Sequence, residues 1–365
     1  MEKLVTLLRK MVDVDASDLH LKAGARPVVR VRTELIDLPF DRLTPASIEE
    51  MAHFIMSDST RTNFKHRGEV DFAYEQDDLG RFRVNVFMQR GRCGVVMRFV
   101  KKDIPTFAEL NLPGVLKNIV SLPSGIAVVS GATGCGKSTT LAAMVGYINS
   151  NFRRHIVTIE DPIEYLHEDD KSIIDQREVG IDTHSFANAL RVVLRQDPDI
   201  IMIGEVRDAD SLRAAIVAAE TGHLVLTTLH TSTAVQAVSR VLDFFSVKER
   251  DQVRIQLSLC LRAVICQKLL PRVDMEGLIP AVEIMIASGT VRKLIRENLI
   301  SKLFGAIQTG GDEGMQTINQ HLVDLVRNGR VSEEVALAAA PQPEVLKMNL
   351  QGIFLDEDKR ILDTD

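Results

Sequence analysis

One short stretch, GATGCGKST at Gly131–Thr139, constrains the fold of this chain more than any other. It follows an apolar run, GIAVVSG, that is typical of a buried strand, and it precedes an apolar segment with helical character. A glycine-rich loop in this context, closed by Gly-Lys-Ser, matches the template of a phosphate-binding loop (P-loop). The glycines permit a tight turn in which backbone N–H groups converge on phosphate oxygens.

The residues of this loop are expected to hold a nucleotide and its metal ion. Lys137 should reach the β- and γ-phosphates, and Ser138 should ligate Mg²⁺. The helix that begins here adds its N-terminal dipole, which favours a bound anion. Cys135 lies beside Lys137, a setting that can lower the pKa of a thiol, although a small residue at a permissive loop position is the simpler interpretation. The predicted nucleotide-binding residues are Thr133, Gly134, Cys135, Gly136, Lys137, Ser138 and Thr139.

Two acidic stretches follow other predicted strands. In DPDIIMIGEVRD an apolar run ends at Glu205, the position of the carboxylate on the Mg²⁺ side in this fold, although the usual residue there is Asp. In TIEDPIEYLHE, Glu160, Asp161 and Glu164 follow a strand-like run. Ligand sites of parallel sheets lie at the carboxyl ends of the strands, so these acids are expected to share the cleft with the nucleotide. Glu164 is the predicted base that orients the attacking water; a solvated loop is the alternative.

Two histidines and two arginines complete the candidate catalytic residues. In TGHLVLTTLHT, His230 follows a predicted strand, where a sensor of the γ-phosphate belongs, whereas His223 precedes that strand and is the weaker candidate. A structural role is the alternative for both. Arg83 and Arg98 lie on polar strand faces, which are usually just solvated. In a ring, one of them could reach a neighbouring subunit's γ-phosphate as an arginine finger.

Composition excludes several classes of function. The net charge of −6, the 5% aromatic content and the absence of Trp argue against a nucleic-acid partner. No apolar run approaches the roughly 20 residues that cross a bilayer. The four cysteines form no CxxC pair, so neither a zinc site nor a disulfide framework is indicated. These features are typical of a cytoplasmic protein.

The pattern of apolar residues predicts an α/β protein with two domains. Residues 1–100 read as a small α+β domain with short antiparallel strands, and residues 101–114 read as a linker with two prolines. Strands alternate with helices over residues 115–275, the signature of a parallel sheet. Residues 276–365 read as a helical region that ends in an acidic tail.

Four sequence boxes occur together and in order: the P-loop GATGCGKSTT, the acidic box IEDPIEY, DPDIIMIGEVRD, and the histidine box TGHLVLTTLHT. In these boxes the chain resembles the secretion-type AAA-like ATPases of the type IV pilus, and within them the PilT/PilU-type retraction ATPases. The resemblance covers nearly the whole chain, from ASDLHL at Ala16–Leu21 through RFRVN to MQT.

The resemblance implies a homohexameric ring in which each chain carries a PAS-like N-terminal domain and a RecA-like core. It implies ATP and Mg²⁺ as cofactors, and hydrolysis coupled to pilin removal through an inner-membrane platform protein. The ring would then be peripheral to the inner membrane, on its cytoplasmic face. By motif position, the resemblance implies a catalytic Glu164, a Walker B Glu205, a histidine box with His223 and His230, and trans-acting Arg83 and Arg98.

Departures from the family pattern leave one choice open. The segment TVRKLIRE at Thr290–Glu297 only approximates the AIRNLIRE element of the retraction motors, and the tail beyond Pro341 looks more like that of PilU-type paralogues. A main motor and an accessory that depends on a paralogous motor therefore both remain possible. The extension and secretion relatives carry an added N-terminal domain and a four-cysteine zinc element. Neither is recognised in this sequence, which argues against an extension or secretion ATPase. A nucleic-acid translocase on the same core is a third, less favoured interpretation.

Overall fold

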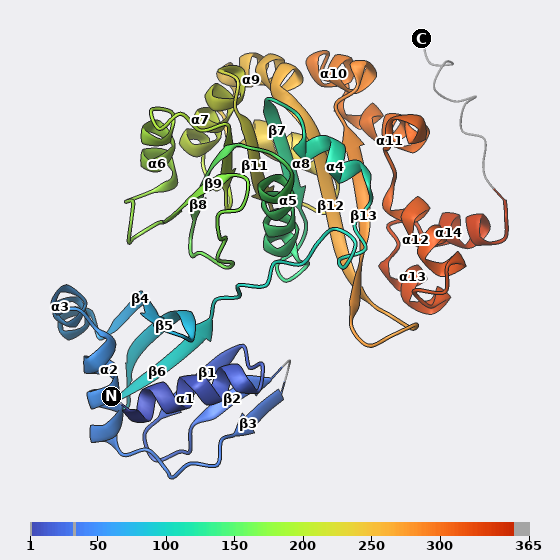
Figure 1. Ribbon diagram of the computed structural model, residues 1–365. Coiled ribbons are helices and arrows are strands. Elements are labelled where there is room, and N and C mark those ends of the chain that lie inside the picture. Colours follow the sequence, from blue (N-terminus) through green and yellow to red (C-terminus); the bar gives the residue numbers. More distant parts are fainter. Residues whose placement is uncertain (1, 32–33, 354–365) are drawn as a thin grey trace. The chain divides into compact units, whose positions relative to one another are not determined.

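The computed structural model describes residues 2–31 and 34–353 (Figure 1). Its contacts divide the chain into two compact units. The first consists of Met1–Asp103 and Pro162–Leu166, and the second of Ile104–Asp161 and His167–Asp365. Residues 162–166 therefore belong to the N-terminal unit, although the sequence on both sides of them belongs to the other unit. The domain limits expected at residues 100, 114 and 275 stay predictions.

The N-terminal unit is built on an antiparallel sheet with the strand order β3-β2-β1-β6-β5-β4. Its strands are β1 (Asp18–Lys22), β2 (Val28–Val31), β3 (Glu34–Asp37), β4 (Glu69–Gln76), β5 (Gly80–Gln89) and β6 (Arg92–Phe99). Its helices are α1 (Glu2–Asp13), α2 (Pro45–Ile55) and α3 (Asp58–Arg67).

Alternation along β5 explains which face of this sheet is buried. Phe82, Val84 and Val86 lie in the core of the unit, while Arg83 lies on the other face, as period-two alternation predicts. Helix α1 covers the core with four leucine and methionine side chains at helical spacing. The segment PVVRVRTELIDL contains an antiparallel pair of strands, β2 and β3.

The second unit is a sheet with the strand order β13-β12-β7-β11-β10-β8-β9. All its pairs are parallel except β12–β13. Its strands are β7 (Gly125–Ser130), β8 (His155–Glu160), β9 (Ile173–Glu178), β10 (Ile200–Ile203), β11 (Leu224–Leu229), β12 (Leu261–Pro271) and β13 (Leu278–Ile286).

Helices cover both faces of this sheet, because alternate residues of β7 belong to different cores. Ile126 and Val128 pack with α6 (Phe186–Val193), α7 (Ala209–Glu220), α8 (Ala234–Asp243) and α9 (Val247–Cys260). Ala127 and Val129 pack with α4 (Val115–Val120) and α5 (Lys137–Asn151) on the opposite face. Figure 1 shows α5 in front of the strands β7 and β11, which it contacts.

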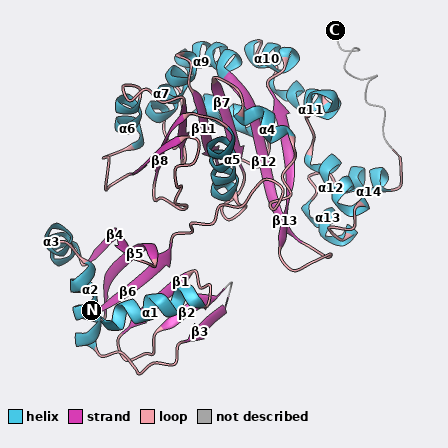
Figure 2. Cartoon of the chain, viewed as in Figure 1, coloured by secondary structure: helices cyan, strands magenta, loops and turns pink. Residues whose placement is uncertain are grey.

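The C-terminal part of the second unit packs against β12 and β13 (Figure 2). Its helices are α10 (Gly289–Arg296), α11 (Leu303–Thr309), α12 (Ile318–Arg327), α13 (Glu333–Ala339) and α14 (Pro343–Leu350), with 3₁₀ turns at Ile300–Lys302 and Gly311–Glu313.

The expectation of purely helical structure after residue 275 is wrong for β13. This strand is buried along almost its whole length, so its sequence, LIPAVEIMI, shows no alternation. A short apolar run of this kind cannot be told from a buried helix by periodicity. Most of the expected acidic tail, residues 354–365, lies outside the described part of the chain. No helix in the described part is both long and apolar enough to span a bilayer.

Candidate nucleotide-binding site

The P-loop connects the buried strand β7 to α5. Helix α5 begins at Lys137, with Gly136 as N-cap in the left-handed region at φ 88°, and among the described residues no side chain caps it. The first N–H groups of a helix lack partners within the helix. At this helix they are available to an anion, as the sequence predicts.

Glycine is required in this loop because the chain approaches itself closely. A Cβ on Gly131 would lie 2.5 Å from Sγ of Cys135 and 2.6 Å from the carbonyl oxygen of Gln267. Gly134, at φ 78°, has no heavy atom within 4 Å of the corresponding position. One side of the loop is therefore packed, while at Gly134 the loop opens to space that a ligand can occupy.

Lys137 is buried at the base of the loop. Its ammonium group donates to the carbonyls of Gly131 at 2.9 Å and Ala132 at 3.1 Å, and it lies 3.3 Å from Nδ1 of His230. A lysine ammonium can only donate, so Nδ1 accepts and the ring proton of a neutral His230 sits on Nε2. That nitrogen lies 3.5 Å from a carboxylate oxygen of Glu205. Lys137, His230 and Glu205 thus meet at the carboxyl ends of β7, β11 and β10, as predicted.

The loop after β11 is tied to the end of β7. The hydroxyl of Ser130, fully buried, bonds to the carbonyl and hydroxyl of Thr231, each at 2.8 Å, and accepts from its N–H at 2.9 Å. These bonds fix the position of the adjacent His230 relative to the P-loop.

Glu205 follows β10 and forms an ion pair with Arg207, whose guanidinium also lies 3.6 Å from Asp161. The hydrogen bond to Glu205 is the main reason why the pKa of Arg207 is raised. Sequence reasoning missed Arg207, although it lies in the same box, GEVRD. No sequence motif distinguishes an arginine at this position from an ordinary solvent-exposed one.

Gln267 is a second residue that sequence reasoning missed. It lies on β12, it is 3% exposed, and its side chain bonds to the carbonyl of Cys135 and to the hydroxyl of Thr140. The one available signal was an amide side chain within the apolar run LRAVICQKLL.

The acidic box divides between the two units. In the second unit the buried carboxylate of Glu160 accepts from the Thr158 hydroxyl at 2.7 Å and from the Gln176 amide at 3.1 Å, so these contacts stabilise the sheet edge. Asp161 contacts Arg207. Glu164 belongs to the segment Pro162–Leu166 of the N-terminal unit.

Glu164 lines a pocket of the N-terminal unit together with Arg83 and Arg98. The pocket has a volume of about 210 Å³, and its other lining residues are Ser17, Phe99, Val100, Lys101, Pro162, Ile163 and Tyr165. The two arginines lie opposite each other on β5 and β6. The segment is held in place by a parallel bridge between Lys101 and Tyr165 and by a 3.0 Å bond from the Leu166 N–H to the Lys101 carbonyl.

Both arginines of this pocket are paired with acids of their own sheet. Arg98 donates to the buried Asp18 at 2.8 Å, and Arg83 lies 3.9 Å from Asp71. The structure therefore groups the two candidate fingers with Glu164 of the same chain, whereas the sequence analysis placed them with a neighbour's nucleotide.

The structure does not bring His223 to the other site residues. His223 precedes β11 and His230 follows it, so the two lie at opposite ends of the strand. Nδ1 of His223 lies 2.9 Å from the Ala218 carbonyl and 3.2 Å from the Thr221 hydroxyl, which are contacts with the end of α7. Within this chain, these contacts hold the ring of His223 against the end of α7, and its catalytic role stays a prediction.

The structure contradicts the less favoured interpretation of Cys135, a thiol with a lowered pKa. Burial raises the pKa of this thiol, and this effect outweighs the opposing effects of Lys137 and of backbone hydrogen bonds. The cysteine therefore fills space beneath the loop as a neutral thiol.

The residues around the P-loop suit Mg²⁺ only as a site with few protein ligands. Within residues 2–31 and 34–353 no cluster of three or more His, Cys, Asp or Glu side chains forms a metal cage. Mg²⁺ is usually bound by few protein ligands together with waters and substrate phosphates. Ser138, in the first turn of α5, and Glu205 suit that pattern.

Residues 6–278 match the model of the family described as type II/IV secretion system protein. The chain belongs to this family. Its relatives in the family include the type IV pilus retraction ATPase PilT of Pseudomonas aeruginosa, which is 44% identical over 90% of this chain and 95% of that protein. The type IV pilus ATPase PilU of the same organism is 41% identical over 94% of this chain and 90% of its own length.

Solved structures of this family agree with the fold. A crystal structure of the pilus retraction motor PilT with bound ADP superposes with a TM-score of 0.87, at 43% identity, and covers 92% of this chain and 96% of that one. The comparison confirms the predicted α/β fold, an ATPase core with an N-terminal domain. This member of the secretion family is accordingly a nucleotide-binding ATPase of the PilT/PilU type.

Proposed function

We propose that this protein is a hexameric motor that hydrolyses ATP to drive type IV pilus retraction, and hence twitching motility. The observation that carries the proposal is the similarity to PilT over nearly the whole of both chains. The convergence of Lys137, His230 and Glu205 at one edge of the sheet supports it. The partner would be an inner-membrane platform protein, with the ring at the cytoplasmic face of that membrane.

In this proposal the P-loop holds ATP and Mg²⁺. The N–H groups from Thr133 to Thr139 bind phosphate oxygens, and Lys137 exchanges its carbonyl contacts for the β- and γ-phosphates. Ser138 and Glu205 would hold Mg²⁺ beside the phosphates. When bound, the metal ion neutralises charge that develops on the transferred phosphoryl group. His230, fixed between Lys137 and Glu205, senses the γ-phosphate.

Glu164, Arg83 and Arg98 supply the remaining catalytic groups. Glu164 orients the attacking water, and an arginine stabilises the charge of the transition state. Because the three side chains line one pocket of one chain, we infer that they act together on the same nucleotide.

ATP hydrolysis, pilus retraction and nucleotide affinity are the measurements that test this function. Purified protein should hydrolyse ATP in the presence of Mg²⁺, and cells without the protein should assemble pili but fail to retract them. Lys137→Ala should abolish tight nucleotide binding in calorimetry and also block retraction. Unchanged nucleotide affinity in Lys137→Ala would contradict the P-loop assignment.

A second candidate is an accessory motor that needs a paralogous ATPase. The similarity to PilU, over 94% of this chain, favours it about as strongly. The two candidates differ in one experiment: a main motor restores retraction in cells that lack both paralogues, and an accessory does not. Stimulation of the ATPase by DNA or RNA would instead favour a translocase.

A further inference from the structure

Gln267 is an amide side chain buried in the centre of the second unit. It lies on β12 one residue beyond Cys266, which pairs with Ser130 at the end of β7. The side chain therefore reaches the P-loop from the neighbouring strand. A buried amide is costly unless its hydrogen bonds are made.

Both ends of this amide are bonded to the nucleotide-binding segment. Its Nε2 donates to the carbonyl oxygen of Cys135 at 2.6 Å, and its Oε1 accepts from the hydroxyl of Thr140 at 3.0 Å. Thr140 is itself 2% exposed and its N–H donates to the carbonyl of Gly136 at 2.9 Å. Gln267 thus joins the last part of the loop to the first turn of α5.

We propose that Gln267 is a positioning residue for the bound nucleotide. It acts by fixing the orientation of the peptide between Cys135 and Gly136. This peptide is planar and trans, so its carbonyl and its N–H point in opposite directions. Gln267 holds the carbonyl on the packed side of the loop and thereby turns the N–H of Gly136 toward the open side. The proposal rests on the proposed function, in which the loop N–H groups bind phosphate.

The shape of the loop agrees with this role. Gly136 has a φ of 88°, and a Cβ there would lie 3.2 Å from Nε2 of Gln267. The amide of Gln267 therefore packs closely against Gly136, the residue whose N–H belongs to the peptide that it orients. Without the amide, the Cys135 carbonyl loses its partner in the described part of the chain, and the peptide is free to rotate.

The first test replaces the amide by a side chain of similar volume, Gln267→Met. A buried carbonyl left without its partner should weaken ADP and ATP binding about 10- to 100-fold, as judged from the usual cost of an unsatisfied group. Calorimetry on the full-length protein measures the affinity, and thermal unfolding without nucleotide measures the stability. The role predicts a loss of affinity in protein that is still folded.

The second test, Gln267→Glu, separates positioning from packing through its pH dependence. A neutral carboxyl can donate to the Cys135 carbonyl and accept from Thr140, whereas an ionised one can only accept. Nucleotide affinity relative to the wild type should therefore approach the wild-type value at low pH and fall as the pH rises. Gln252→Glu, the same change at an exposed position of α9, is the matched control and should show a constant ratio.

Each outcome decides between the possibilities. Wild-type affinity in Gln267→Met, or a pH-independent ratio in Gln267→Glu, overturns the proposal. Failure of both variants to fold assigns Gln267 to the core and also overturns it. Lys137→Ala is the parallel control: if that variant binds nucleotide normally, the P-loop assignment fails, whereas loss in Lys137→Ala with no loss in the Gln267 variants rejects only the role of Gln267.

Discussion

Five polar side chains form a chain of contacts at the end of the central strands. In order, they are the ammonium of Lys137, the ring of His230, the carboxylate of Glu205, the guanidinium of Arg207 and the carboxylate of Asp161. Each group is in contact with the next, so replacing one changes the position of its neighbours. We therefore expect paired substitutions in this cluster to have non-additive effects on nucleotide affinity.

The thiol of Cys135 should be unreactive. Burial raises its pKa above its ordinary value of 9.0, so little thiolate is present at neutral pH. Labelling of this residue by iodoacetamide in the folded protein should be slow near pH 7 and should accelerate up to and beyond pH 9. Mass spectrometry of the alkylated peptide measures the rate.

Cys135→Ser should accordingly hydrolyse ATP much as the wild type does, with the same sensitivity to oxidants. Rapid alkylation of Cys135 at neutral pH, or oxidant resistance gained by the serine variant, would contradict the inference of a neutral, space-filling thiol.

From the sequence, three candidate site residues could be placed together because each follows a predicted strand. Lys137, Glu205 and His230 each follow a strand of the parallel sheet, and such ends meet at one edge. Arg207 and Gln267 could not be found in this way, because their roles depend on side-chain directions. Glu164 and Arg83 line one pocket although they lie far apart in the sequence, and no local pattern indicates this grouping.

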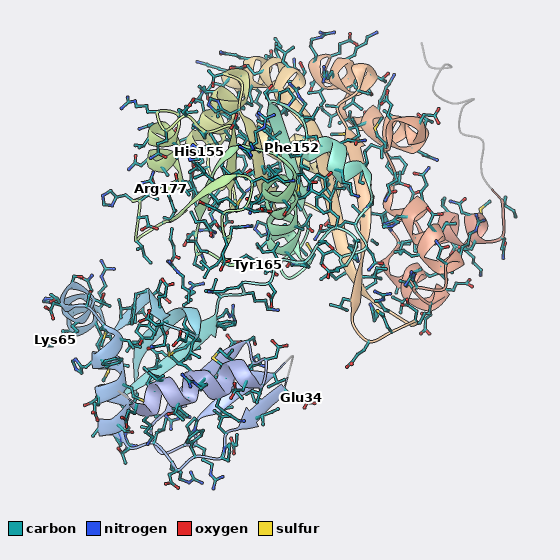
Figure 3. All side chains as sticks on the ribbon, viewed as in Figure 1. Glu34, Lys65, Phe152, His155, Tyr165 and Arg177 are labelled. Atoms are coloured by element: carbon teal, nitrogen blue, oxygen red, sulfur yellow. The ribbon has the colours of Figure 1, made fainter. Side chains whose placement is uncertain are left out.

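At the scale of elements, a titratable contact joins the outermost strand β9 to His155 of β8, the residue labelled in Figure 3. Nε2 of His155 lies 3.0 Å from Asp175, and Nδ1 lies 3.2 Å from the Asp197 carbonyl. Burial alone would lower the pKa of His155, but the bonds to Asp175 and to Asp197 outweigh it and raise the pKa.

A raised pKa in the folded state means that the folded protein binds this proton more tightly. The contribution to stability is complete below the unfolded value of 6.5 and is lost as the pH rises through the folded pKa. His155→Gln should therefore be less stable than the wild type at pH 5.5, and the difference should shrink by pH 8. Urea unfolding at both pH values measures it; a difference that grows with pH would contradict this assignment.

Helix α10 presents basic residues on its surface while Val291 and Ile295 are buried beneath it. Arg292, Lys293 and Arg296 are exposed, which suits a docking surface outside the nucleotide site. Arg296→Glu should therefore leave ATP hydrolysis close to that of the wild type and block pilus retraction. An equal loss of hydrolysis and retraction would show instead that the helix supports the site.

Strands with two buried faces account for most of what the sequence did not predict in the fold. The strands β7, β8, β10 and β11 were found because motifs or acidic ends bracket them. Strand β13 has no such bracket. Strand β9 is mostly polar, and exposed and half-buried residues alternate only over its first four positions, so tertiary pairing with β8 decides its conformation.

At the scale of the whole molecule, the pocket on the N-terminal unit leads to a prediction about the ATPase activity of rings mixed from two variants. If Arg83 and Glu164 of one chain act on the same nucleotide, a ring assembled from Arg83→Ala and Glu164→Gln subunits has no complete site. Each variant alone should be nearly inactive, since an arginine finger is worth ~10³–10⁵ in rate. Mixed rings should remain inactive in a steady-state ATPase assay.

The opposite arrangement gives the opposite result. If Arg83 served the nucleotide of a neighbouring subunit, some sites in mixed rings would be complete and activity would return in part. Wild-type subunits mixed with either variant provide the control that rings re-form and hydrolyse ATP. Full activity in rings of Arg83→Ala alone and of Arg98→Ala alone would remove both arginines from the mechanism.

The segment Pro162–Leu166 also limits how this protein can be divided or recombined. The chain passes between its units three times, after Asp103, after Asp161 and after Leu166. An N-terminal fragment that stops at Asp103 would lack one wall of its own pocket. A chimaera that takes residues 1–103 from a relative would join that relative's arginines to this chain's Glu164. Recombination between paralogues should therefore be tolerated only where residues 162–166 are inherited together with the N-terminal unit.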